Sequence, residues 1–392
     1  MPKDIAPGTE RNEGTVVRVV LAVLRYLPAL GGSTRVVQLL AEGVAARGHE
    51  VTVVTQEEPG CPAEEQIGGV SVVRLRMRHV GGFRVPRNYL GRLRGLDADV
   101  FHLHGNRIWC ADYYFPFARS FDWPQVITPH GFYHYWMRRG TIRWLYYDHY
   151  FPGRLRAFDR YIALTEGEAR QVVGWKFPPE RLRTIPNGID LGEFALPSGD
   201  PVATRSSWGL TARHLAVYVG GLYDNKRVDR LVRAIARLRG DWGLVVVGVD
   251  VPGSAYDRAH CEALARDLGA PVRFLGPTSR EDVLDALGAA DAYVQGSAFE
   301  GFGIGLLEAM AAGLPFVAYD AGAARELAAT GAGFVVGSDE EMAARLTEVV
   351  DHRETFTRAA RDAIPAYSAE RMVDRHLDLY RSVLRTAPRS ER

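Results

Sequence analysis

The sequence predicts an α/β protein of two doubly wound, Rossmann-like domains that face each other across a cleft. Three observations lead to this prediction. First, 392 residues exceed what one ordinary hydrophobic core accommodates. Second, short apolar runs alternate with helical patterns, as buried parallel strands alternate with helices in α/β proteins. Third, this alternation stops at a segment with several prolines and glycines, residues 195–211, and then starts again.

The first half opens with a predicted βαβ unit. Residues 16–24 are apolar except for Arg18 and form the first strand, and residues 51–55 form the second strand. The helix between them starts after Gly31 and Gly32 and ends at Gly48. Sheets of this kind bind ligands in the loop that follows a strand. Further strands of this half are expected at residues 100–104, 126–128, 161–165 and 184–186.

The second half repeats the pattern. A helix is expected at residues 227–239, and a last amphipathic helix near residues 369–384 is expected to pack back across the seam between the domains. The strands expected in this half are residues 215–220, 244–248, 272–276, 292–295 and 316–319.

Composition excludes several classes of protein. Lys and Arg total 48 against 47 Asp and Glu, so no global field attracts nucleic acid. The three cysteines are widely spaced, which predicts neither a disulfide framework nor a zinc site and fits a reducing cytosol. No apolar run approaches the ~20 residues that span a bilayer, and residues 1–14 lack a hydrophobic signal region.

The most informative segment follows the strand expected at residues 292–295. Three glycines at alternate positions open a short helix between two carboxylates. These residues are Glu300, Gly301, Gly303, Gly305 and Glu308. Alternating glycines let backbone N–H groups approach an anion, and the helix start adds partial positive charge. The pattern favours a cradle for a nucleotide sugar over a turn that serves packing alone.

Several separate motifs occur in a fixed order along the chain. They are Gly31-Gly32, RGHEVTV at residues 47–53, Thr128-Pro129-His130-Gly131, IPNGID at residues 185–190, Val219-Gly220-Gly221 with Lys226, and the segment from Glu300 to Glu308. On these motifs the chain resembles family 4 retaining glycosyltransferases of the GT-B fold (glycosyl transferases group 1). The resemblance runs from about residue 16 to residue 384. It implies an N-terminal acceptor-binding domain (15–195), a C-terminal nucleotide-sugar-binding domain (196–367) and a C-terminal helix (368–386) packed back on the first domain.

The resemblance also implies site roles. Glu308 is expected to hold the ribose hydroxyls, Lys226 the diphosphate, and Glu300 the transferred sugar. His130 is expected to hydrogen-bond the donor sugar near the reacting carbon. Backbone groups around the donor complete the expected site, at Gly31, Gly32, Gly301, Phe302, Gly303 and Ile304.

One position departs from the family pattern. The family usually has an arginine where this chain has Gly221, and that arginine helps Lys226 neutralise the leaving diphosphate. We expect another cation to compensate, with Arg227 as the candidate. Reduced donor affinity and a catalytically impaired nucleotide-binding subunit of the same fold are the alternatives.

Metals and cofactors are not expected. Lys226 and a helix dipole are sufficient to handle the leaving charge, so no divalent metal is required. Asp97 and Asp99 imitate a metal-binding pair but are interpreted as a solvated strand entrance. His102 and His104 share a strand face and could join His130 or His134 around a metal. Because no carboxylate or cysteine completes such a ligand set, we favour packing or acceptor contact for them. A phosphorylase of this fold needs a lysine-bound pyridoxal phosphate, and no glycine-flanked lysine suggests one.

Two stretches mix arginine with aromatic residues in the half where the resemblance places the acceptor. They contain Arg74, Arg76, Arg78, Phe83, Arg84, Arg87, Tyr89, Arg92 and Arg94, and then Trp136, Arg138, Arg139, Arg143, Trp144, Tyr146, Tyr147, Arg154 and Arg156. Such a mixture suits a membrane interface or a phosphate-bearing acceptor, and equally a solvated face over buried aromatics.

Taken together, the motifs and composition lead us to expect a cytoplasmic hexosyltransferase that uses a UDP- or GDP-sugar, and peripheral contact with the inner membrane surface stays open. A glycan, lipid-linked or small-molecule acceptor is expected.

Overall fold

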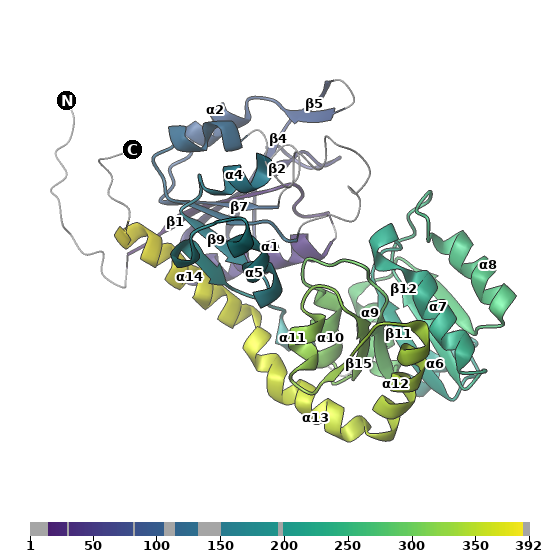
Figure 1. Ribbon diagram of the computed structural model, residues 1–392. Coiled ribbons are helices and arrows are strands. Elements are labelled where there is room, and N and C mark those ends of the chain that lie inside the picture. The colour runs from purple at the N-terminus through teal and green to yellow at the C-terminus, as the bar shows by residue number, and fades with distance from the viewer. Residues whose placement is uncertain are drawn as a thin grey trace, which may run out of the picture.

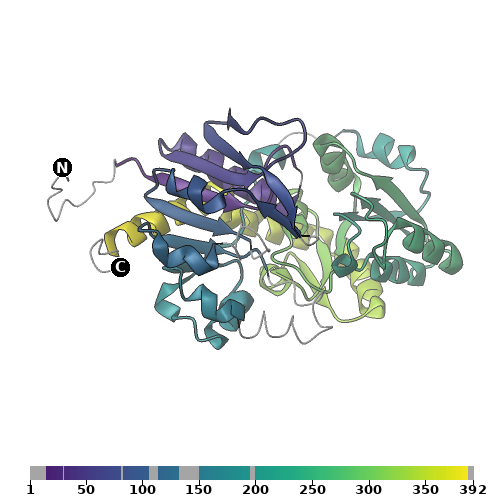
Figure 2. The same ribbon diagram turned by 90° about the horizontal axis from the view of Figure 1, so that it is seen from above.

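The computed structural model of the protein describes residues 15–29, 31–80, 83–105, 114–131, 150–194 and 199–386. Two α/β domains lie side by side, and a long C-terminal helix runs from one to the other (Figures 1 and 2). This confirms the predicted fold class. The domain boundary near residue 195 falls at residues 195–198, outside the described residues, so its position stays a prediction.

The first domain is built on an eight-stranded sheet of order β10-β9-β8-β7-β1-β2-β4-β3, parallel except for the β3–β4 pair. Its strands are β1 (Arg18–Val23), β2 (Glu50–Gln56), β3 (Glu64–Ile67), β4 (Val70–Leu75), β7 (Val100–His104), β8 (Gln125–Thr128), β9 (Arg160–Ala163) and β10 (Leu182–Thr184), and a separate hairpin has β5 (Met77–Val80) and β6 (Phe83–Pro86). Its helices are α1 (Gly32–Ala46), α2 (Tyr89–Arg94), α4 (Phe151–Leu155) and α5 (Glu166–Gly174), with 3-10 turns η1 (Phe115–Ser120), η4 (Pro179–Arg181) and η5 (Leu191–Phe194).

The second domain is built on a six-stranded parallel sheet of order β13-β12-β11-β14-β15-β16. Its strands are β11 (His214–Val219), β12 (Trp242–Val247), β13 (Val272–Gly276), β14 (Ala292–Gln295), β15 (Phe316–Tyr319) and β16 (Gly333–Val336). Its helices are α6 (Pro201–Ser207), α7 (Val228–Arg237), α8 (Arg258–Leu268), α9 (Arg280–Ala289), α10 (Ile304–Ala311), α11 (Ala324–Ala328), α12 (Asp339–Asp351) and α13 (Arg353–Ala363), with 3-10 turns η6 (Asp224–Lys226) and η7 (Ile364–Tyr367).

Burial explains why these segments form strands. Every residue of β7, β12, β14 and β15 is buried, because helices cover both faces of each sheet. In the first domain, one face packs against α2, α4 and α5 and the other against α1. In the second, α9, α10, α11 and α13 cover one face, while α7, α8 and α12 cover the other.

The C-terminal helix, α14 (Ala369–Thr386), leaves the second domain and packs on the first, as predicted (Figure 1). Its residues Val373, Leu377 and Tyr380 belong to the core formed by α1 and the sheet. A Cβ on Gly43 of α1 would lie 2.6 Å from Val373 Cγ2, so the two helices are in direct contact. Among the described residues, no helix combines the length and the apolar character needed to cross a bilayer.

Strand order locates the binding edge of each sheet. The order reverses between β1 and β7 in the first domain and between β11 and β14 in the second. Doubly wound sheets bind ligands at the carboxyl ends of the strands beside such a reversal. We therefore expect the functional site in the loops that follow these four strands and the neighbouring strand β8.

Candidate active site

The loop between β14 and α10 is held in one shape by close packing. Gly303 precedes α10 with a φ of 97°, in the left-handed region that favours glycine. In the first turn of α10, a Cβ on Gly305 would lie 2.9 Å from Tyr293 Cζ and would overlap the phenol oxygen. Phe302 is buried in the core. The first N–H groups of α10 have no partner within the helix, and the positive end of the helix dipole faces the same way.

Lys226 and Glu300 meet beside this helix start. Lys226 Nζ lies 2.6 Å from Glu300 Oε1, which also accepts a hydrogen bond of 2.7 Å from Ser297 Oγ. The two loops are joined by backbone and side-chain hydrogen bonds, because Ala298 donates to the carbonyl of Asn225 (2.8 Å) and the Asn225 amide donates to the carbonyl of Phe299 (3.0 Å). An ammonium and a carboxylate are therefore fixed together where a diphosphate and a sugar are expected.

Glu308 lies one turn into α10, and its carboxylate is bound by Arg280 at 2.5 Å. Arg280, at the start of α9, also binds Glu193 of η5 at 2.8 Å, and Glu193 in turn pairs with Arg35 of α1. Burial raises the pKa of the Glu308 carboxyl above its ordinary value, and the Arg280 guanidinium opposes that rise. The predicted ribose ligand thus belongs to a chain of ion pairs that reaches the first domain.

Arg280 and Glu193 were missed by the sequence analysis. Arg280 lies next to Ser279, whose side chain forms a capping box with Asp282, so its surroundings in sequence indicate an ordinary helix start. Its importance comes only from partners far along the chain.

The space beside Gly221 is filled by Tyr223. A Cβ on Gly221 would lie 2.6 Å from Tyr223 Cε2. The Arg227 guanidinium is held by both carboxylate oxygens of Asp229, at 2.9 and 3.0 Å, and lies 4.5 Å from the centre of the Tyr256 ring. These contacts already engage Arg227, so its side chain would have to leave Asp229 to neutralise the diphosphate in place of the missing arginine. This role of Arg227 stays a prediction.

The first domain touches the glycine loop at two points. A Cβ on Gly32 would lie 3.0 Å from Ile304 Cδ1, so the start of α1 faces the start of α10. A Cβ on Gly131 would lie 3.0 Å from the Gly301 nitrogen, and a Cβ on Gly301 would lie 2.8 Å from the carbonyl carbon of His130. Two glycines therefore let the backbones of the two domains meet. Gly31 lies just before α1, at the same edge.

This contact places His130 next to the loop that carries Glu300. His130 follows β8 and has a φ of 59°, a left-handed conformation that is uncommon for a residue with a Cβ. Its Nε2 lies 2.9 Å from His104 Nδ1. Burial lowers the pKa of His130 to about 4, so the imidazole is neutral at physiological pH.

The described residues contain no group of three or more His, Cys, Asp or Glu side chains arranged to hold a metal ion. His134 lies outside the described residues. Asp97 and Asp99 both pair with Arg18 at the amino ends of β1 and β7, away from the carboxyl ends that carry the site. The interpretation of this pair as a solvated entrance was wrong for Asp99, which is 3% exposed.

The arginine-rich stretches are described only in part. The second lies mostly within residues 132–149, outside the described residues. In the first, Arg74 is buried, pairs with Glu65 and donates to the carbonyl of Leu27 at 2.8 Å, so its role is structural. Arg92 is exposed and lies 3.1 Å from Glu64.

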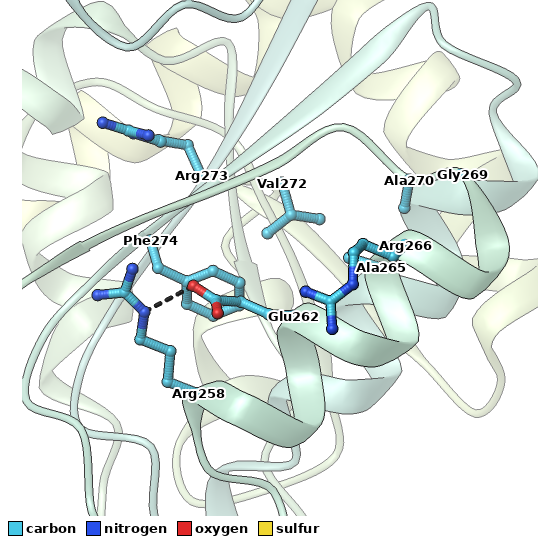
Figure 3. A pocket seen from close by; sticks show the side chains of 9 residues that line it. All are labelled: Arg258, Glu262, Ala265, Arg266, Gly269, Ala270, Val272, Arg273 and Phe274. Carbon is cyan, nitrogen blue, oxygen red and sulfur yellow. Dashed lines mark hydrogen bonds and ion pairs between the residues drawn. The ribbon is translucent and has the colours of Figure 1, made fainter.

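A groove of about 350 Å³ lies elsewhere, between α8 and the edge strand β13 (Figure 3). Three arginines line it, and one of them, Arg258, pairs with Glu262 at 2.7 Å. None of the predicted site residues contributes to it.

Both domains match known protein families. Residues 204–364 match the family described as glycosyl transferases group 1, and residues 30–193 match the one described as glycosyltransferase family 4. A GDP-mannose-dependent alpha-mannosyltransferase of Mycolicibacterium smegmatis is 28% identical over 387 residues, which cover 94% of this chain and 98% of that protein. A D-inositol 3-phosphate glycosyltransferase of Geodermatophilus obscurus is 34% identical over 230 residues, or 55% of this chain, and the chain spans about half (51%) of that relative's length.

A solved structure shares the fold over almost the whole chain. Sucrose-phosphate synthase from Thermosynechococcus elongatus superposes with a TM-score of 0.78 at 22% identity, covering 94% of this chain and 99% of that one. The two family matches fall on the two domains in chain order, and the loops that carry Lys226, Glu300 and His130 lie within them. The chain therefore belongs to the family 4 glycosyltransferases, and it is a glycosyltransferase of the GT-B fold.

Proposed function

We propose that this enzyme moves a hexosyl group from a nucleoside diphosphate sugar to a glycan, lipid-linked or small-molecule acceptor, with retention of configuration and without a divalent metal. The observation that carries the proposal is the meeting of Lys226, Glu300 and the start of α10 at the strand reversal of the second domain. His130 approaches the same place from the first domain.

The proposed chemistry separates the charges of the donor. Lys226 and the N–H groups at the start of α10 stabilise the negative charge that develops on the diphosphate as the bond from the anomeric carbon to the phosphate oxygen breaks. Glu300 and His130 bind hydroxyls of the transferred sugar and so orient the anomeric carbon. The acceptor oxygen attacks from the face that the diphosphate leaves, and its proton passes to the departing phosphate oxygen.

GDP-mannose is the donor to test first. The relative from Mycolicibacterium smegmatis is named as GDP-mannose-dependent, and the similarity to it extends over nearly the full length of both chains. We propose that Glu308 accepts hydrogen bonds from the ribose hydroxyls, a contact that does not depend on the base. A UDP-sugar is the second donor class to test.

Nucleotide release tests the proposal. With GDP-mannose and an acceptor extract, or with water as a slow acceptor, wild-type protein should release GDP and should continue to do so with excess EDTA. Lys226→Ala and Glu300→Gln should each lower kcat by about 10²- to 10³-fold, as the loss of one charge-stabilising group does in comparable sites. Lys176→Ala and Glu354→Gln, at exposed positions outside the candidate site, are the matched controls.

Two results would contradict this proposal. If GDP-mannose and the UDP-sugars bind but no nucleotide is ever released, the chain acts as a binding subunit. If EDTA abolishes release and Mg²⁺ restores it, the metal-independent mechanism is wrong.

We further propose that the protein works in the cytoplasm and meets its acceptor at the inner membrane surface. Arg76, Arg78 and Arg94 are exposed around the β5–β6 hairpin and α2, which supports contact with an anionic surface. Flotation with liposomes tests this: anionic vesicles should carry the protein at low salt and neutral vesicles should not. No flotation with either would contradict the membrane part and leave the sugar chemistry untouched.

A further inference from the structure

Three buried histidines, His102, His104 and His376, and the half-buried His130 form a cluster at the carboxyl end of the first sheet. His102 and His104 lie two residues apart on β7 and so face the same side of the sheet. Their ring centres are 3.9 Å apart, the His104 and His130 rings are 5.2 Å apart, and the His102 and His376 rings are 5.7 Å apart. The cluster connects the loop of His130 to α14.

The two members nearest α14, His102 and His376, are anchored by hydrogen bonds. His102 binds the Tyr380 hydroxyl at 2.7 Å through Nδ1 and the Thr128 hydroxyl at 2.8 Å through Nε2. His376 donates from Nδ1 to the carbonyl of Met372 at 2.8 Å. Because both ring nitrogens of His102 are bound, that ring supports the neighbouring His104 ring in a fixed position.

The contact between His104 and His130 restricts where protons lie. His104 Nδ1 and His130 Nε2 are 2.9 Å apart. A hydrogen bond between two nitrogens needs one that carries a proton and one that does not. Burial lowers the pKa of His104 well below its ordinary value and that of His130 to about 4, so both rings are neutral at pH 7. One proton therefore lies between the two rings. In each ring, the second nitrogen carries a proton if the first does not, and lacks one if the first carries it.

The second nitrogen of His130 is the one available to a ligand. No described residue is hydrogen-bonded to His130 Nδ1, and the His130 carbonyl touches Gly301 next to Glu300. Whether Nδ1 donates or accepts toward a sugar hydroxyl depends on which of the two rings donates across the 2.9 Å contact. A partner that fixes the tautomer of a functional histidine also fixes its ring orientation.

We propose that His104 is a positioning residue, which holds the His130 ring in one orientation and one tautomer so that Nδ1 meets the donor sugar with a defined proton. This inference rests on the proposed role of His130 in sugar transfer. It assigns a function to His104 that does not require His104 to touch the substrate.

Two variants separate this role from packing. His104→Phe keeps a flat buried ring and removes the hydrogen bond, while His104→Asn keeps a polar group near the position of Nδ1. We expect His104→Phe to lower kcat with GDP-mannose by about 10- to 100-fold, the range found when a metal-binding histidine loses its hydrogen-bond partner, with KM changed by less than about threefold. His104→Asn should recover most of the loss. His376→Phe, in the same cluster but with no hydrogen bond or ring contact to His130, should keep near wild-type kcat and controls for altered packing.

Nitrogen-15 NMR of the histidine side chains supplies a readout that is independent of activity. In the wild-type protein, His130 should show one tautomer at pH 7, and in His104→Phe it should show a mixture. A mixture of tautomers in the wild type would overturn the proposal, and so would an unchanged single tautomer together with wild-type kcat in His104→Phe. If His104→Phe does not fold, the wild-type spectrum alone tests the proposal. If the wild type releases no nucleotide from any donor, the proposed function fails, while the NMR result still decides whether His104 sets the tautomer.

Discussion

Substituting Gly301 by alanine should separate the two domains where they meet. A Cβ at this position would lie 2.8 Å from the carbonyl carbon of His130 and would overlap its oxygen. Ordinary contacts need a separation larger by roughly 1 Å, and backbone cannot give way as a flexible side chain does. The contact lies between domains, so a small movement of the domains apart relieves it without strain in either core.

The expected effect is therefore large on catalysis and small on stability. A misplacement of about 1 Å at reacting groups costs about 10²-fold in rate. We expect Gly301→Ala to lower kcat with GDP-mannose by about 100-fold and to change the unfolding free energy by less than about 1 kcal/mol, below the 1–3 kcal/mol typical of an overpacked core.

Steady-state kinetics and urea unfolding measure the two quantities. Gly174→Ala is the matched control, because a Cβ at Gly174, the last residue of α5, meets nothing within 4 Å. Wild-type kcat in Gly301→Ala would refute the claim that His130 and the glycine loop must meet for turnover. A large loss of stability together with the loss of kcat would show that the contact holds the fold instead.

Three further predictions follow from the charges of the site and the histidine cluster. Arg280→Gln removes the cation that opposes the rise in the pKa of Glu308, so the pKa of Glu308 should rise further. The affinity for GDP should then fall at a higher pH during acidification, as calorimetry between pH 8 and pH 5 measures. An unchanged profile would mean that Glu308 does not bind the nucleotide. Because burial lowers the pKa of His376 to about 4 from an ordinary value of 6.5, the unfolded chain binds its proton first, and stability should fall between about pH 6.5 and pH 4, by roughly 3 kcal/mol for this group. His376→Gln should lose less stability than the wild type over this range in urea unfolding, and an equal loss would contradict the assignment. Glu308→Gln should weaken GDP binding by about tenfold or more, since a hydrogen bond to a charged group contributes about 1.5–3 kcal/mol, and equal Kd values would contradict the ribose contact.

The fold was predictable because its strands are buried on both faces. A continuous apolar run such as β12, where all six residues are buried, stands out in a sequence. The edge strand β3 could not be recognised in the sequence, because Glu64–Ile67 is short, polar and only partly buried. The β5–β6 hairpin was missed for the same reason, since Met77–Val80 is largely exposed.

The site was predictable where its residues are close in sequence or fixed by a motif. Glu300, Gly301 and Gly303 lie within one loop, and Lys226 pairs with Glu300, a contact that the resemblance did not state. Arg280 was not identified as a site residue, because its significance arises from long-range pairing. His104 was placed within reach of His130, with packing or acceptor contact favoured, but its hydrogen bond to His130 was not predicted. That bond depends on the parallel register of β7 and β8, which periodicity alone does not fix.

The central claim is that the start of α10, Lys226 and Glu308 together hold the nucleotide. A crystal structure of the protein with GDP tests this most directly. The diphosphate should lie within hydrogen-bonding distance of Lys226 Nζ and the first N–H groups of α10, with the ribose hydroxyls on the Glu308 carboxylate. Density for GDP in the groove between α8 and β13, with the α10 mouth empty, would contradict the account.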